Sequence, residues 1–140
     1  MDGIRTGVHV CRGNWSRRED VLLTGDYTSL APALARMKVQ QLVLEYATPR
    51  AGDISAVGEA LAGHEIGLGV VNPRTAQVET PAQIVARVEQ ALHYFSPERI
   101  FLNPDCGFGC FANRCVNDEA TAAAKLAAIA EAARILRDRY

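Results

Sequence analysis

The sequence predicts an α/β fold in which four βα units build one parallel sheet. Four short runs rich in β-branched and other apolar residues alternate with four longer runs that have helical periodicity. That order is typical of strands joined by helical crossovers. Apolar residues make up 49% of the 140-residue chain, which is enough to fill a core between sheet and helices.

The four expected strands are Thr6–Cys11, Gln41–Tyr46, Ile66–Val71 and Arg99–Asn103. In the first, Val8 and Val10 alternate with His9 and Cys11, so the two pairs point to opposite faces. The second contains Leu42-Val43-Leu44, a continuous apolar run typical of a strand buried on both faces. These patterns favour a parallel sheet covered by helices.

Apolar stripes predict the helices. The stripes are Leu30, Leu34 and Met37 in the first helix, Ile54, Val57 and Leu61 in the second, and Leu126, Ile129, Ala133 and Leu136 in the last. Thr80-Pro81-Ala82-Gln83 predicts the start of the third helix, because Thr80 can cap it and Gln83 can reach back to the cap. Asn117-Asp118-Glu119 opens the last helix with acidic residues that suit the helix dipole.

The length of the chain sets a problem for this fold. Four βα units in 140 residues match half of a TIM (β/α)8 barrel, whose usual length is about 250 residues. Half a barrel has two unpaired sheet edges and an inner face without opposing side chains. The chain is therefore either an open four-stranded α/β sandwich or one half of a barrel. The exposed edges predict a homo-oligomer or a partner that completes the barrel.

Composition excludes several classes of function. The 15 Lys and Arg residues balance 16 Asp and Glu residues, so no basic surface for nucleic acid is expected. No apolar run reaches the roughly 18 residues of a membrane span. The first residues lack the pattern of a secretory signal, so we expect a cytoplasmic protein. In that reducing compartment its four cysteines should be thiols or metal ligands.

Candidate metal ligands follow three of the four strands. His9 and Cys11 are two residues apart on a strand and share one face; Glu45 ends the next strand and Cys106 follows the last. Active sites of α/β folds collect at these carboxyl ends. One imidazole, one carboxylate and two thiolates suit a tetrahedral zinc ion. The spacing also fits a structural histidine, inert buried thiols, and a Glu45 paired with Arg50 or Arg74.

A zinc site of this kind suits thiol chemistry. A thiol bound to the metal is deprotonated at neutral pH and becomes a sulfur nucleophile for an alkyl group. We expect Cys110 and Cys115 to be incidental thiols. Asp105 is expected either to support a zinc ligand or to cap a helix, and the polar stretch 12–26 to be either a loop over the site or a solvated connection.

The motifs around these residues resemble a known family. His9-Val10-Cys11, Glu45 and Asn103-Pro104-Asp105-Cys106-Gly107 resemble the zinc-ligand motifs in the catalytic C-terminal domain of cobalamin-independent methionine synthase. Cys11-Arg12-Gly13-Asn14 and the stretch from Phe111 to Arg114 look more like relatives that alkylate other thiols. The resemblance implies that residues 1–140 form the C-terminal half of the family's barrel. It also implies zinc as the metal, held by His9, Cys11, Glu45 and Cys106.

Two departures from the family pattern bear on the reaction. Where methionine synthases carry a histidine thought to donate a proton, this chain reads Asn72-Pro73-Arg74-Thr75. A guanidinium does not give up its proton near neutral pH, so we expect Arg74 to orient an anionic group of the substrate instead. The half of the barrel that supplies much of the family's substrate surface is also missing from these residues.

The predicted function is a zinc-dependent methyltransferase-like activation of a small, homocysteine-like thiol. It is related to the 5-methyltetrahydropteroyltriglutamate–homocysteine S-methyltransferases, with methyl transfer completed only if another polypeptide supplies the missing half. Three alternatives stay open. One is alkyl transfer to another thiol such as coenzyme M. Another is a catalytically incomplete half-barrel that acts only as an associating subunit, and the third is an inert remnant with a structural zinc ion.

Overall fold

The computed structural model describes residues 3–140 as one parallel sheet with helices. The elements in chain order are β1 (Gly7–Val10), a 3-10 turn η1 (Glu19–Val21), α1 (Ala31–Leu34), β2 (Gln41–Leu44), η2 (Pro49–Ala51), α2 (Ser55–Leu61), β3 (Glu65–Val71), α3 (Pro81–Ala91), η3 (Pro97–Arg99), β4 (Ile100–Pro104) and α4 (Glu119–Arg139).

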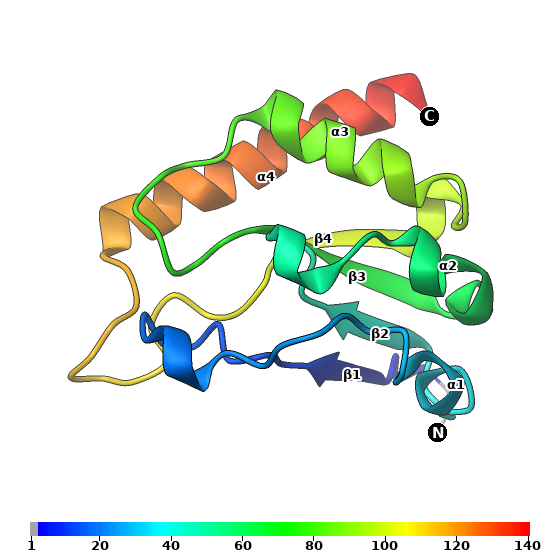
Figure 1. Cartoon of the computed structure of the whole chain (residues 1–140). Helices are drawn as coiled ribbons and strands as arrows, with labels where there is room; N and C mark the ends of the chain where they lie inside the picture. The colour runs from blue at the N-terminus through cyan, green and yellow to red at the C-terminus, as the bar shows by residue number, and fades with distance from the viewer. Residues whose placement is uncertain (1–2) are drawn as a thin grey trace.

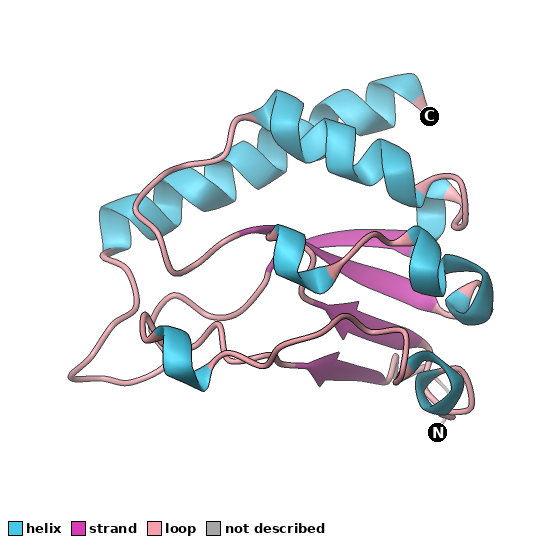
Figure 2. Ribbon diagram, in the orientation of Figure 1, coloured by secondary structure: helices cyan, strands magenta, loops and turns pink. Residues whose placement is uncertain are grey.

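The strands lie in the order β1-β2-β3-β4, and every pair is parallel. Because consecutive strands are neighbours and crossovers are right-handed, all connecting helices fall on one face of the sheet. In Figure 1, α3 and α4 lie side by side above β3 and β4, whereas α1 is drawn at the lower right, near the starts of β1 and β2; Figure 2 shows the same arrangement with the helices in cyan. No helix among residues 3–140 is long and apolar enough to cross a membrane.

The core fills the space between the sheet and its helices. Side chains that point toward the helices from the two central strands are fully buried, among them Leu42, Leu44, Ile66, Leu68 and Val70. The alternate positions form what we call the inner face of the sheet, made of Gly7, His9, Gln41, Val43, Glu65, Gly67, Gly69, Phe101 and Asn103. Within residues 3–140 no helix packs on this inner face, which matches the uncovered interior of a half-barrel.

The expected strands are all present with small shifts at their ends. β1 and β2 are shorter than predicted, so Cys11 and Glu45 lie just beyond their strands instead of within them. The third and fourth helices begin as predicted: Thr80 and Gln83 form a capping box, and the Asp118 carboxylate accepts from the Thr121 backbone N–H.

Two helix predictions were wrong in detail. The first helix is only four residues long, and two members of its predicted stripe, Leu30 and Met37, are exposed. In the last helix, Leu126 is half exposed, whereas its neighbour Lys125 is fully buried. The Lys125 ammonium pairs with Glu79 at 2.8 Å and also donates to the Gln77 carbonyl. Lys125 is therefore buried as part of an ion pair, although it lies outside the apolar stripe that the sequence predicted to face the core.

The burial of Lys125 and the exposure of Leu126 lead to a prediction about stability. Lys125→Ala should lower the free energy of unfolding by about 3–5 kcal/mol, because it leaves a largely buried carboxylate without its cation. Leu126→Ala, the matched control one residue along the same helix, should change it by no more than about 0.5 kcal/mol. Urea unfolding followed by circular dichroism measures both values. A larger loss for Leu126→Ala than for Lys125→Ala would show that the sequence-based stripe is correct.

Candidate metal centre

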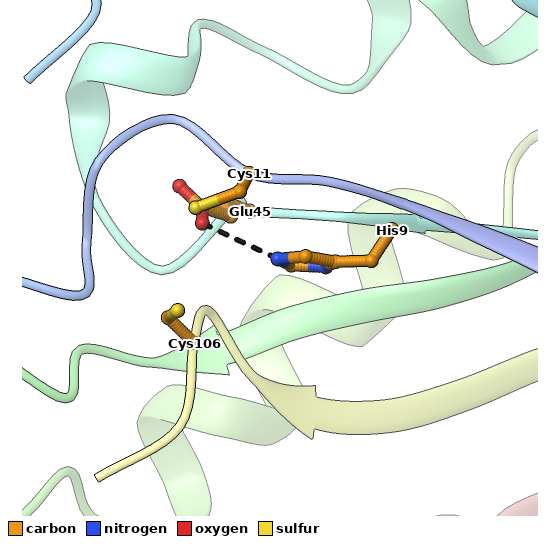
Figure 3. A group of neighbouring side chains, drawn as sticks. All are labelled: His9, Cys11, Glu45 and Cys106. Atoms are coloured by element: carbon orange, nitrogen blue, oxygen red, sulfur yellow. Dashed lines mark ion pairs between the residues drawn. The ribbon is translucent and has the colours of Figure 1, made fainter. Parts of the chain in front are cut away.

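Four side chains from three strand ends converge at the carboxyl edge of the sheet. His9 lies in β1, Cys11 follows it, Glu45 follows β2 and Cys106 follows β4. One ligand atom from each side chain, a ring nitrogen, a carboxylate oxygen and two sulfurs, lies within 4.8 Å of the other three. Figure 3 shows the four side chains turned toward one another. The structure therefore brings together the complete ligand set that the sequence predicts.

Glu45 is the most constrained of the four. Its side chain is only 1% exposed, and burying a carboxylate is costly unless it is well partnered. Oε2 accepts from the Arg12 backbone N–H at 3.0 Å and from Asn14 Nδ2 at 2.7 Å. Oε1 is buried without a hydrogen-bond partner and lies 3.7 Å from His9 Nε2. An anionic oxygen without a donor, next to two sulfurs and an imidazole, fits a bound cation.

Burial disfavours the thiolate form of both cysteines of the group. Burial raises the pKa of Cys11 to about 11, and the charges of Glu45 and Cys106 add to that effect. Burial likewise raises the pKa of Cys106, with a contribution from Cys110. A divalent cation would lower the pKa of both thiols, because it attracts thiolates and offsets the negative charge of the Glu45 carboxylate.

The loop after β1 folds back over Glu45. Gly13 has φ +96°, and a Cβ there would lie 2.4 Å from the Val21 carbonyl oxygen, so this turn requires glycine. The turn brings Asn14 onto Glu45. The Arg12 guanidinium then fastens the far end of the loop by donating to the carbonyls of Leu23 and Gly25. The start of the stretch 12–26 therefore packs against the candidate ligand Glu45, whereas most of residues 17–26 is exposed.

Asp105 joins the strand ends together. Its buried carboxylate accepts from the Ala47 backbone N–H at 2.9 Å and from Asn14 Nδ2 at 3.2 Å, and burial raises its pKa to about 7. A Cβ at Gly69 would lie 2.1 Å from Asp105 Oδ1, so the glycine in β3 makes room for this carboxylate. Asp105 does not cap the last helix, because Asp118 is the residue at that position. The side-chain partner of Asp105 is Asn14 rather than a candidate ligand.

Sequence reasoning missed two residues that shape the site. Asn14 was named only as part of a motif, yet it is fully buried between Glu45 and Asp105. The Tyr27 hydroxyl accepts from the Glu45 backbone N–H at 2.9 Å and donates to the Val10 carbonyl at 3.2 Å. It therefore joins the ends of β1 and β2. No local pattern around Tyr27 signals this role, because its partners lie on other strands.

The other candidates lie outside the ligand group. Arg74 Nε donates to the Ser16 carbonyl at 2.6 Å, and its Nη2 pairs with Glu19 at 2.5 Å. Its anion-orienting role stays a prediction. Cys110 and Cys115 are exposed and are absent from the ligand group found among residues 3–140.

The chain matches a family of known proteins over nearly its whole length. A family model described as the catalytic domain of cobalamin-independent synthase matches residues 3–134. The chain belongs to this family. It is 32% identical over 134 residues to a methionine synthase of Pyrococcus abyssi, covering 96% of this chain and 34% of that protein. It is 25% identical over 114 residues to a methionine synthase of Saccharolobus islandicus, covering 81% of this chain and 32% of that one.

A solved structure supports the fold of a family member. A B12-independent methionine synthase from Shewanella sp. W3-18-1, in complex with selenomethionine, superimposes with a TM-score of 0.79 at 19% identity. The match covers 99% of this chain and 40% of that one. The prediction of four parallel βα units from a (β/α)8 barrel is confirmed. The chain spans about a third of the length of the curated relatives it matches.

Proposed function

We propose that this chain binds zinc through His9, Cys11, Glu45 and Cys106 and uses it to activate a small thiol for methyl transfer. The observation that carries the proposal is the convergence of the four ligand atoms within 4.8 Å around a Glu45 oxygen that has no hydrogen-bond partner. Two sulfurs favour zinc over magnesium or calcium, and the single nitrogen and oxygen complete a tetrahedral set.

The chemistry follows from this donor set. Zinc, when bound, would stabilise the thiolate form of a substrate thiol at neutral pH. Methyl transfer would form the sulfur–carbon bond as the bond from the methyl carbon to its donor breaks, with the donor taking the electron pair and, overall, the proton released by the thiol. Of the proposed ligands, His9 has a side chain that is 38% exposed and Glu45 one that is 1% exposed. Substrate therefore approaches from the inner face, on the His9 side.

Arg74 provides a reason to expect an anionic thiol. Its guanidinium already pairs with a carboxylate, that of Glu19, whose side chain is 82% exposed while that of Arg74 is 10% exposed. A substrate carboxylate or sulfonate could replace this exposed partner at Arg74. Homocysteine and coenzyme M both carry such a group, so Arg74 alone does not distinguish between them.

Metal content is the first test. Protein purified without chelator should contain stoichiometric zinc, and Cys11→Ser should lose most of it because a hydroxyl is a poor replacement for a thiolate ligand. Cys115→Ser is the matched control, since that thiol is exposed and outside the ligand group. Plasma emission spectrometry gives the ratio. Negligible zinc in the wild type, with Cys11→Ser no different from Cys115→Ser, contradicts the proposal.

Thiol binding is the second test and separates a catalytic from a structural zinc. Cobalt-substituted protein titrated with homocysteine should change its visible absorption as the thiol joins the ligands, and Arg74→Gln should weaken this titration. A parallel titration with coenzyme M ranks the two thiols. An unchanged spectrum at saturating concentrations of both thiols means that the zinc has no position for substrate.

We further propose that a second polypeptide completes the barrel. The inner face is bare within residues 3–140, and β4 is an edge strand. A hollow of about 650 Å³ runs beside this edge, lined by apolar side chains that include Ile100, Leu102, Leu136 and Tyr140. Unpaired edges and apolar hollows of this kind favour association. In the absence of another partner, a second copy of the chain occupies this edge.

Light scattering tests the association. The isolated chain should be larger than a monomer at micromolar concentration, and Tyr140→Asp should shift it toward monomer because Tyr140 lines the hollow and is 60% exposed. Leu23→Asp changes a side chain of similar exposure, 59%, in the loop after β1 and should have no effect. A monomer at every concentration, in all three proteins, argues against association through β4.

A further inference from the structure

The two oxygens of Glu45 have different surroundings, and Asn14 is largely responsible. Oε2 receives two donors, the Arg12 backbone N–H and Asn14 Nδ2, whereas Oε1 receives none. A carboxylate oxygen that already accepts two hydrogen bonds is a weaker ligand than its free partner. The arrangement therefore leaves Oε1 as the oxygen available to a cation, on the side of His9.

The orientation of the Asn14 amide is itself fixed. Its Oδ1 accepts from Arg50 Nη2 at 3.2 Å, and its Nδ2 faces the carboxylates of Glu45 and Asp105 at 2.7 and 3.2 Å. A flipped amide would place its carbonyl oxygen against two carboxylates and its NH2 group against a guanidinium. The carboxylate of Glu45 and the guanidinium of Arg50 therefore favour this orientation of the amide.

Asn14 also connects the strand ends that carry three of the proposed ligands. It lies shortly after Cys11 in the loop after β1, and it donates to Glu45, which follows β2. It also donates to Asp105, the residue directly before Cys106. A single fully buried side chain thus relates the positions of these three ligands.

We propose that Asn14 is a positioning residue for the metal centre, which holds Glu45 so that Oε1 alone is presented to the ion. The proposal rests on the proposed zinc binding and deepens it. Residues that hydrogen-bond to metal ligands typically change metal affinity by about 10- to 100-fold when they are removed. A merely structural asparagine would affect folding stability but not the ion's coordination.

The chain offers a matched control in Asn117. Asn117 is also buried, and its Nδ2 also donates two hydrogen bonds, to the carbonyls of Pro73 and Thr75 at 2.8 and 2.7 Å. It contacts none of the proposed ligands. Asn14→Ala and Asn117→Ala therefore remove similar buried amides, only one of which touches Glu45.

Zinc affinity, measured on the full chain by competition with a chromogenic chelator, decides between the two roles. Asn14→Ala should bind zinc about 10- to 100-fold more weakly than the wild type, whereas Asn117→Ala should match the wild type. The visible absorption of the cobalt form should also change in Asn14→Ala alone, because the second carboxylate oxygen loses one of its two hydrogen-bond donors and competes better for the ion. Equal affinities and equal spectra in the two variants overturn the proposal.

A second variant keeps the test decisive if Asn14→Ala does not fold. Arg50 is half-buried, and Arg50→Met removes the hydrogen bond that orients Asn14 while leaving Asn14 in place. Loss of a nearby positive charge by itself strengthens cation binding, whereas loss of the Asn14 orientation weakens it. Weaker zinc binding by Arg50→Met supports the positioning role, because loss of the charge alone acts in the opposite direction, and tighter binding overturns it.

Failure of this inference is distinguishable from failure of the proposed function. Wild-type protein that binds no zinc overturns both. Zinc bound tightly by the wild type and equally tightly by Asn14→Ala and Arg50→Met overturns only the role of Asn14.

Discussion

The buried carboxylate of Glu45 is the constraint on which the site depends. An ionised carboxylate with almost no exposure is stable only when donors or a cation surround it, and hydrogen bonds account for one of its two oxygens. The neighbouring residues supply these donors or make room for them. The left-handed turn at Gly13 returns the loop, Asn14 and the Arg12 backbone supply donors, and the glycine at position 69 makes room for Asp105, which accepts from Asn14.

The fold explains why half of a barrel can hold a whole ligand set. Strands β1, β2 and β4 end at the same edge of the sheet, and the long loops after β1 and β4 meet there, as Figure 1 shows. Every proposed ligand lies on these strand ends, so the metal centre needs no residue from elsewhere. What a complete barrel adds is cover for the inner face and for the β4 edge. If the proposed zinc site is correct, metal binding does not require the rest of the barrel, whereas methyl transfer does.

The sequence could predict what depends on local pattern. The spacing of His9 and Cys11, the position of Glu45 after an apolar run and the capping box at Thr80 each follow from a few neighbouring residues, and the structure places them as predicted. Contacts between distant residues were out of reach. Lys125 is buried because Glu79, 46 residues away, pairs with it, and Asn14 is important because Glu45, 31 residues away, accepts its hydrogen bond. The exposed Leu126 and the short first helix reflect the same limit, since periodicity cannot tell which stripes find a partner.

Zinc K-edge X-ray absorption on the isolated chain tests most directly whether these four side chains form a metal centre. A zinc ion held by these four side chains should be four-coordinate. Two neighbours should be sulfur, from Cys11 and Cys106, and two should be nitrogen or oxygen, from His9 and Glu45. Three or four sulfur neighbours would mean that the exposed Cys110 and Cys115 take part, and an ion without sulfur neighbours would mean that the site lies elsewhere. Either result would contradict a zinc site formed by His9, Cys11, Glu45 and Cys106.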